Sequence, residues 1–283
     1  MAKKLRLGFH RELSGAQQEQ AMAIYYDTQN WRAIVKQDIE SRWRIHFTDE
    51  KIKEVLRYDA KQRDTYFSGG QICLLWQDEQ EWKTIGTIHT VVTLQESIQN
   101  MFPKRDTWNE FTTYGRLSSQ IYNPLGTRWA CFAIQTDKQM DKEKVGVKPA
   151  DIILKSVRLQ AYAQQNEYEE LEERVDFSAG FREAIGTHTL VEYINPLTRL
   201  SGFSRCKEKF RELSAQEYAS CIERIVRKEV DESGRLQEIS EIAKTCSLRY
   251  HLSRGARIEK VIEEFRVHDA ASLGYGASVL YAR

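Results

Sequence analysis

An apolar run, a lysine-rich loop with one glycine and a helix start follow one another between residues 129 and 165. Trp129 to Gln135 reads WACFAIQ, a continuous apolar run typical of a strand buried on both faces. A charged loop follows, and Pro149 occupies the first turn of the expected helix, where a missing N–H costs little. Backbone N–H groups at a helix N-terminus bind anions, and the lysines of the loop add positive charge. The pattern predicts a phosphate or pyrophosphate site here, with an ordinary solvated lysine-rich loop as the alternative.

A second group of residues with useful chemistry lies near the C-terminus. Leu248-Arg249-Tyr250-His251 precedes Gly255, and Arg266 and the run SLGYG follow. An imidazole can donate a hydrogen bond or transfer a proton near neutral pH. A guanidinium can hold a carboxylate by two parallel hydrogen bonds. The simpler alternatives are a packed histidine at position 251 and a surface ion-pair partner at position 266.

The elements that must position these residues can be predicted from hydrophobic periodicity. Two short β-rich runs, QICLLWQ and TIGTIHTVVTL, flank a polar turn and predict a hairpin. Asn123 to Gly126 predicts a turn before the apolar strand. Further strands are expected at 190–194 and 277–281, and 257–265 fits a strand or a helix. Helices are expected over the following ranges: 12–40, 48–66 with Thr48 as N-cap, 149–173, 208–228 and 236–250.

Composition excludes several classes of function. The 283 residues carry a net charge of +1, which gives no electrostatic reason for binding nucleic acid. We find no apolar run long enough to span a membrane and no apolar segment after the basic N-terminus that would form a secretory signal. The five cysteines form no CxxC pair and no zinc-type spacing with histidine. We therefore expect a reduced cytoplasmic protein without a metal.

The C-terminal segment LRYHLSRGARIEKVIEEFR and the later run SLGYGASVLY resemble the C-terminal part of GNAT acyltransferases. The resemblance is closest to the GNAT-like decarboxylase and acyl-loading domains of polyketide synthase loading modules. Earlier segments agree with that family in order over residues 40–283. The resemblance implies an α/β (α+β) fold with a mixed, mostly antiparallel central sheet flanked by helices.

The same resemblance implies one GNAT-like domain over residues 1–283. Residues 1–47 would form a helical N-terminal part, and residues 166–190 and 208–245 would be insertions, because they are longer than the loading-module pattern expects. The insertions would form a lid or a substrate pocket.

Catalytic roles also follow from the resemblance. In the loading-module family a His and a Thr act in the decarboxylation of a malonyl-thioester, and an Arg lies downstream of the His. His251 matches this His in its LRYH context, Arg266 follows fifteen residues later, and Ser204 in Ser204-Arg205-Cys206 takes the Thr position. Loss of CO₂ leaves an enolate, which hydrogen-bond donors aimed at the thioester oxygen stabilise. His251 would donate there or protonate the carbanion, and Arg266 would hold the substrate carboxylate.

The implied ligand is a coenzyme A thioester, acetyl-CoA or malonyl-CoA, that serves as substrate. The residues expected to bind it are Ile134, Gln135, Thr136, Val145, Gly146, Val147 and Lys148. The family loop has the form Gln/Arg-x-x-Gly-x-Gly/Ala, whereas the chain has Glu143 at the first position and Lys148 at the last. CoA binding would then be weakened, or the phosphopantetheine arm of an acyl carrier protein would take its place.

Three functions remain open at this point. The first is decarboxylation of a malonyl-type thioester, or transfer of a short acyl group to a carrier thiol, in secondary metabolism. The second is a conventional acetyl-CoA-dependent N-acyltransferase, with Glu192 or a water as base. The third is a non-catalytic GNAT-like domain that binds CoA or a partner, which the altered loop favours.

Overall fold

The computed structural model describes residues 4–27, 70–94, 122–140 and 142–283, together with single positions between 48 and 64. The chain divides into two compact units. Unit 1 comprises residues 1–97, 112–194 and 283, and unit 2 comprises residues 98–111 and 195–282. Both combine helices with a mostly antiparallel sheet, so the predicted α/β (α+β) class is confirmed. The assignment of all 283 residues to one domain stays a prediction.

The sheet of unit 1 has the strand order β5-β1-β2-β3-β4. The strands β1 to β4 pair in antiparallel fashion, and β1 pairs with β5 in parallel. Their bounds are β1 Leu5–Phe9, β2 Gln71–Asp78, β3 Glu81–Thr93, β4 Arg128–Thr136 and β5 Val175–Phe177. The predicted hairpin is β2 and β3, and the predicted apolar strand is β4. Strand β1 departs from the sequence-based expectation, which makes residues 1–47 helical.

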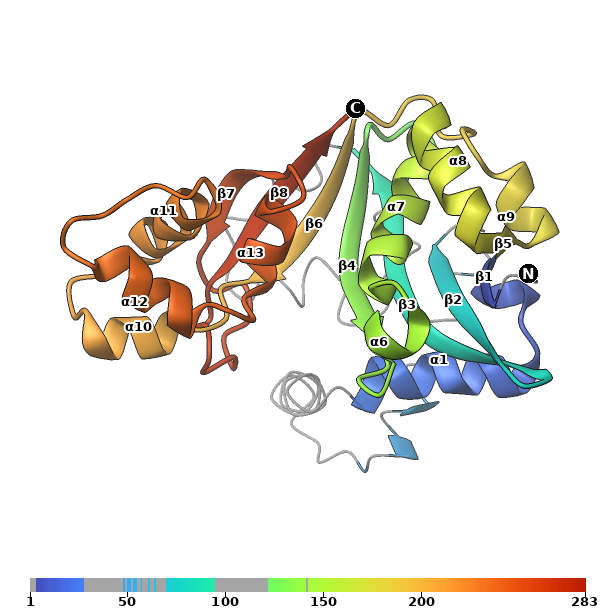
Figure 1. Ribbon diagram of the computed structural model, residues 1–283, viewed down its shortest axis with the longest axis horizontal. Helices are drawn as coiled ribbons and strands as arrows, with labels where there is room; N and C mark the ends of the chain where they lie inside the picture. Colours follow the sequence, from blue (N-terminus) through green and yellow to red (C-terminus); the bar gives the residue numbers. More distant parts are fainter. Residues whose placement is uncertain are drawn as a thin grey trace. The chain divides into compact units, whose positions relative to one another are not determined.

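Helices α1 (Gly15–Asp27) and α7 (Pro149–Tyr162) cover opposite faces of this sheet (Figure 1). Cys73 and Leu75 of β2 pack with Ala21 of α1. Leu74 lies between them in sequence and pairs with Gly86, where an added Cβ atom would meet Ile153 of α7. Because successive residues of a strand point to opposite faces, the two helices must lie on different sides.

The helix expected over 149–173 is two helices. Helix α7 ends at Tyr162, and α8 spans Gln165–Arg174. Ala163 between them adopts a left-handed conformation with φ 45°. This conformation ends a helix and is usually left to glycine or asparagine, so the alanine carries no sequence signal for a break.

The segment 166–190, expected as an insertion, builds part of unit 1. After α8 it contains β5 and the short helix α9 (Ala179–Glu183). Strand β5 extends the sheet next to β1. Phe181 of α9 packs against Phe9 of β1, with 5.7 Å between the two ring centroids. The segment therefore closes one side of the sheet.

The helix expected over 48–66 is only partly described. The described positions from 50 to 64 are helical, and Thr48 Oγ1 accepts a hydrogen bond from Lys51 N at 3.3 Å, as its predicted N-cap role requires. The expected helical residues 28–40 lie outside the described part of the chain.

The described residues of unit 2 form the strand order β6-β8-β7 and four helices. The strands are β6 Tyr193–Arg199, β7 Arg257–Ile262 and β8 Gly276–Ala282. The helices are α10 Phe203–Lys209, α11 Ala215–Val226, α12 Arg235–Ile242 and α13 Ser247–Leu252. The two long helices expected over 208–228 and 236–250 are thus four shorter ones, while the closing strand is confirmed.

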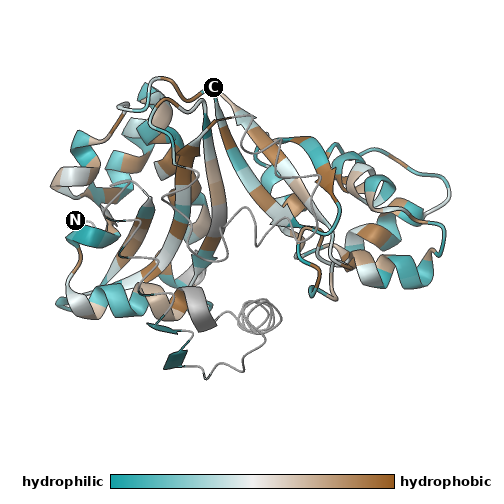
Figure 2. Ribbon diagram, turned by 180° about the vertical axis from the view of Figure 1, so that it is seen from behind, coloured by the Kyte–Doolittle hydropathy of each residue, from teal (hydrophilic) through white to brown (hydrophobic). Residues whose placement is uncertain are grey.

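The core of unit 2 forms where these helices pack on β8. Phe203, Tyr218, Ile222, Leu248 and Val279 belong to one buried apolar cluster. Figure 2 shows the apolar colour concentrated on the strands and polar colour on much of the helical surface. Ser214 and Glu217 form a reciprocal capping box that starts α11. Leu248 of α13 and Val279 of β8 share this cluster, so packing gives the short helix α13 its place against β8.

Candidate functional site

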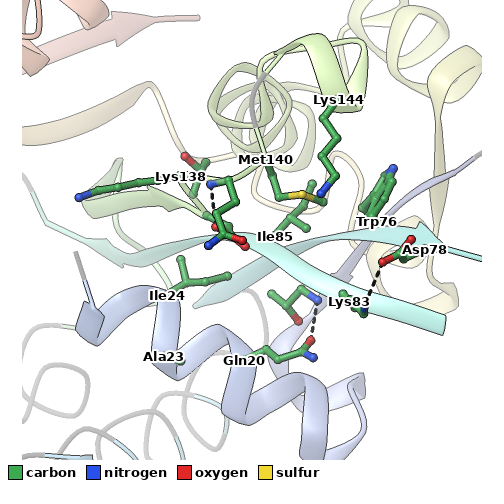
Figure 3. Close-up of a pocket in the computed structure, with 14 residues that line it drawn as sticks. Gln20, Ala23, Ile24, Trp76, Asp78, Lys83, Ile85, Lys138, Met140 and Lys144 are labelled. Atoms are coloured by element: carbon green, nitrogen blue, oxygen red, sulfur yellow. Dashed lines mark hydrogen bonds and ion pairs between the residues drawn. The ribbon is translucent and has the colours of Figure 1, made fainter. Parts of the chain in front are cut away.

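A pocket of about 510 Å³ in unit 1 lies at the end of β4, the place where the sequence predicts an anion site (Figure 3). Its walls come from α1, the β2–β3 hairpin, the end of β4 and the loop that follows, which includes the short helix α6 (Lys142–Val145). The apolar part is formed by Ile24, Ile85 and Met140. The pocket therefore combines an apolar surface with the lysine-rich loop.

The charged groups of this pocket are three lysines and two aspartates. Lys83 forms an ion pair with Asp78 at 2.9 Å, which holds the pKa of the Asp78 carboxyl below its ordinary value. Lys144 extends from α6 toward Trp76, with its ammonium 5.4 Å from the ring centroid, and Lys138 lies on the other side of the pocket (Figure 3). An aromatic ring with cations beside it suits a ligand that has both a flat ring and anionic groups.

The backbone at the start of α7 offers few donors to an anion. Pro149 has no N–H, and the N–H of Asp151 donates to Lys148 O at 3.0 Å. The Asp151 carboxylate adds negative charge in the first turn. Gly146 has φ +80° and follows the end of α6, where a left-handed residue terminates a helix. The glycine is therefore explained by the helix end, and the cations of the pocket are the stronger anion-binding feature.

The seven residues predicted to bind the thioester are distributed around this junction. Thr136 lines the pocket, and among the described residues the other six are outside its lining. Gln135 is buried, and its Oε1 has no hydrogen-bond partner in the described part of the chain. Val145 and Val147 are half-buried, whereas Gly146 and Lys148 are exposed. Ile134 is half-buried in β4. Their role in thioester binding stays a prediction.

In unit 2, His251 lies on α13 and is buried against the end of β8. Its Nδ1 is 3.0 Å from the hydroxyl of Tyr281. Burial, aided by the nearby Arg254, lowers the pKa of His251 to about 3. His251 is therefore a neutral imidazole, held from one side, at physiological pH.

A hydroxyl at the end of β6 is not among the site residues predicted from the sequence. Thr198 is buried, and its Oγ1 donates to Ser247 Oγ at 2.5 Å. Ser247 lies four residues before His251 on α13, so both residues lie on the same face of that helix. The signal available in the sequence was a Thr-Arg pair, Thr198-Arg199, directly after a mostly apolar run.

Ser204, expected to take the Thr position, lies in the first turn of α10. Its N–H donates to Ala271 O at 3.3 Å, in the turn between Arg266 and Gly274. Strand β6 ends five residues earlier, at Arg199. The catalytic role of Ser204 stays a prediction.

Arg266 is buried at the start of this turn, with its guanidinium 5.7 Å from the centroid of the Phe265 ring. Its N–H donates to Gly274 O and its carbonyl accepts from Asp269 N. Asp269 pairs with Arg199 at 3.4 Å and accepts from Ser272 Oγ at 2.8 Å. This turn therefore fixes the backbone of Arg266, whose guanidinium is buried. A buried guanidinium is stabilised by an anionic group beside it.

Other candidate groups are placed less favourably. Glu192, considered as a base, is exposed, and its backbone carbonyl accepts from Tyr162 Oη at 3.1 Å. In the part of the chain that the structure covers, we find no group of three or more His, Cys, Asp or Glu side chains able to hold a metal ion. No described helix combines the length and apolar character needed to cross a bilayer.

No protein-family model and no curated protein matches the sequence. The structure is similar to the loading GNATL domain of CurA from Lyngbya majuscula, at 16% identity and TM-score 0.46 over 100% of this chain and 98% of that chain. It is also similar to the GphF GNAT-like decarboxylase in complex with isobutyryl-CoA, at 14% identity and TM-score 0.48 over 99% of this chain and 98% of that chain.

A malonyl-CoA decarboxylase from Rhodopseudomonas palustris is similar at 14% identity and TM-score 0.40, over 83% of this chain and 54% of that chain. All three TM-scores are below 0.5, so the function has to be inferred from the residues of this chain.

Proposed function

We propose that this protein is a GNAT-type enzyme acting on acyl-coenzyme A thioesters, and that its reaction is the decarboxylation of a malonyl-type thioester. The sequence resemblance motivates the proposal. His251 would stabilise the enolate that forms when CO₂ leaves, and Arg266 would hold the carboxylate that is lost. Thr198 would take the hydroxyl role that the resemblance gives to Ser204.

The observation that carries the proposal is the environment of His251. The imidazole is buried, its Nδ1 lies 3.0 Å from the Tyr281 hydroxyl, and burial lowers its pKa to about 3. A neutral imidazole held in this way can donate a hydrogen bond to a developing oxyanion through its protonated nitrogen. A buried guanidinium such as that of Arg266 binds a planar carboxylate by two parallel hydrogen bonds.

The pocket of unit 1 supports the coenzyme A part of the proposal. The CoA nucleotide has a flat adenine ring and several phosphates. Trp76 offers a ring face, and Lys138 and Lys144 offer positive charge. The lysine side chains would then bind the CoA phosphates in place of backbone N–H groups, because Pro149 removes one such donor at the start of α7.

The proposal is tested by incubating the full chain with malonyl-CoA and following acetyl-CoA by mass spectrometry. We expect acetyl-CoA to form without any acceptor. Controls contain no protein or the His251→Ala variant, which has no side-chain hydrogen-bond donor at this position. Formation of acyl product only when acetyl-CoA and an amine acceptor are supplied would replace the proposal by N-acyl transfer.

A binding role without catalysis is favoured by the poor donor set at the start of α7. In that case the chain would bind CoA esters without turnover. A ligand at 100 times its Kd stabilises a protein by about 2.7 kcal/mol, which a thermal-unfolding experiment detects. A thermal shift with malonyl-CoA but no acetyl-CoA product would support this second function.

A further inference from the structure

The Tyr281 hydroxyl contacts two polar atoms of the same histidine. It lies 3.0 Å from His251 Nδ1 and 3.2 Å from the His251 carbonyl oxygen. A phenol has one proton, so it can donate to only one of these two atoms at a time. The choice decides which ring nitrogen of His251 carries the proton.

The carbonyl oxygen already has two partners. His251 O accepts from Arg254 N at 3.0 Å and from Ala256 N at 3.2 Å, because α13 ends there. Two backbone donors use the two lone pairs of a carbonyl oxygen. The Nδ1 position is closer to the phenol, and it accepts the phenolic proton when the neutral ring carries its own proton on Nε2. The Tyr281 hydroxyl therefore donates its hydrogen bond to His251 Nδ1 in preference to the carbonyl oxygen.

We infer that Tyr281 is a positioning residue that donates to His251 Nδ1 and so holds His251 as the tautomer protonated at Nε2. The inference deepens the proposed function and rests on it. Nε2–H is then a neutral hydrogen-bond donor on the side of the ring opposite Tyr281. The tyrosine acts through the histidine and touches no substrate.

This tautomer selects one kind of chemistry. In decarboxylation the bond between the carboxylate carbon and the α-carbon breaks, CO₂ leaves, and the electron pair moves into the thioester as an enolate. His251 Nε2–H donates a hydrogen bond to the enolate oxygen and transfers no proton. The α-carbon then takes its proton from water, which leaves hydroxide. Acyl transfer to a thiol or an amine needs a proton acceptor, and a protonated Nε2 cannot fill that role.

The direct test is the ¹⁵N NMR spectrum of the full chain labelled at histidine. The resonances of His251, one of six histidines, are identified by their loss in the His251→Gln variant. We expect the coupling pattern of a neutral ring protonated at Nε2 in the native protein. Tyr218→Phe is the matched control, because it removes a buried tyrosine hydroxyl of the same unit that donates to Ser201 O at 2.7 Å. A ring protonated at Nδ1 in the native protein would overturn the inference.

Kinetics with malonyl-CoA give a second readout. Tyr281→Phe keeps the buried ring but removes the phenol, so His251 loses its fixed tautomer. We expect kcat to fall roughly ten- to a hundredfold with little change in KM, while Tyr218→Phe keeps the native kcat. An unchanged tautomer and an unchanged kcat in Tyr281→Phe would contradict the inference. The NMR result needs no turnover, so a native protein with the Nε2–H tautomer but no decarboxylation would refute the proposed function alone.

Discussion

Charged and polar groups are arranged differently in the pocket of unit 1 and in the cluster around His251 of unit 2, which comprises His251, Tyr281, Thr198 and Ser247. In the pocket, lysine ammonium groups stay partly solvated and gather beside an aromatic ring and an apolar surface. In the cluster, His251 is buried and neutral, and its polar neighbours are connected by specific hydrogen bonds. Solvated charge contributes to binding and is screened by salt, whereas a buried neutral donor acts on charge that develops nearby. The comparison separates a region suited to hold a ligand from one suited to stabilise a transition state.

The largest effect is expected for His251→Ala, which leaves no side-chain hydrogen-bond donor at this position. Loss of a donor to a developing oxyanion lowers kcat by about 10²- to 10³-fold, with a small change in KM. Malonyl-CoA turnover followed by mass spectrometry measures the change, and urea unfolding confirms that the variant is folded. A variant with native kcat would show that unit 2 does not carry the chemistry.

Acid is expected to destabilise the protein through the same histidine. The pKa of His251 is about 3 in the folded chain, and its ordinary value is 6.5. Between these two pH values the unfolded chain therefore binds a proton at His251 that the folded chain does not bind. This contribution to stability is present above pH 6.5 and is lost as the pH falls toward 3. Between pH 7 and pH 4.5 the loss amounts to about 2 to 3 kcal/mol.

Urea unfolding at both pH values measures this effect. The His251→Gln variant is the reference, because acid also protonates carboxylates in both proteins. The native protein should lose more stability than the variant over this interval. Equal losses would mean that His251 titrates normally in the folded chain.

The lysines of the pocket should affect binding and leave catalysis unchanged. The double variant Lys138→Ala/Lys144→Ala is expected to weaken CoA binding by about tenfold, since each partly solvated charge contributes up to roughly 1 kcal/mol. The native protein should also lose affinity as salt increases, and the variant should lose less. Isothermal titration with CoA at two salt concentrations measures both.

Lys148→Ala is the matched control for this pair. It removes one ammonium group from the same loop but from outside the described lining of the pocket. A larger effect from Lys148→Ala than from the double variant would move the nucleotide site to the start of α7.

The smallest effect concerns the hydroxyl pair of unit 2. Ser247→Ala leaves the buried Thr198 hydroxyl without its acceptor at 2.5 Å, and we expect a loss of about 1 kcal/mol in the free energy of unfolding. Ser204→Ala, on the partly exposed start of α10, should change it by less than about 0.5 kcal/mol. The reverse order in urea unfolding would show that the Ser204 hydroxyl contributes more to stability than the Thr198–Ser247 hydrogen bond.

Several features of the fold could be predicted because they depend on local patterns. β-branched residues on both sides of a polar turn predicted the β2–β3 hairpin, and a short apolar run predicted β4. The Thr48 cap could be predicted because a hydroxyl and an amide three residues apart meet within one helical turn. The left-handed Ala163 could not be, since nothing in an alanine marks that conformation.

The sequence by itself determined the hairpin, the central strand with its lysine-rich loop, and the presence of a histidine and an arginine fifteen residues apart. Only the tertiary structure decided that Thr198, and not Ser204, meets Ser247, and that Tyr281 faces His251 across thirty residues of chain. The tertiary structure also pairs β1 with β2, which lies more than sixty residues later in the sequence. Such pairings depend on which distant surfaces pack together, and the free energy of that packing is a property of the assembled core, which no local pattern encodes.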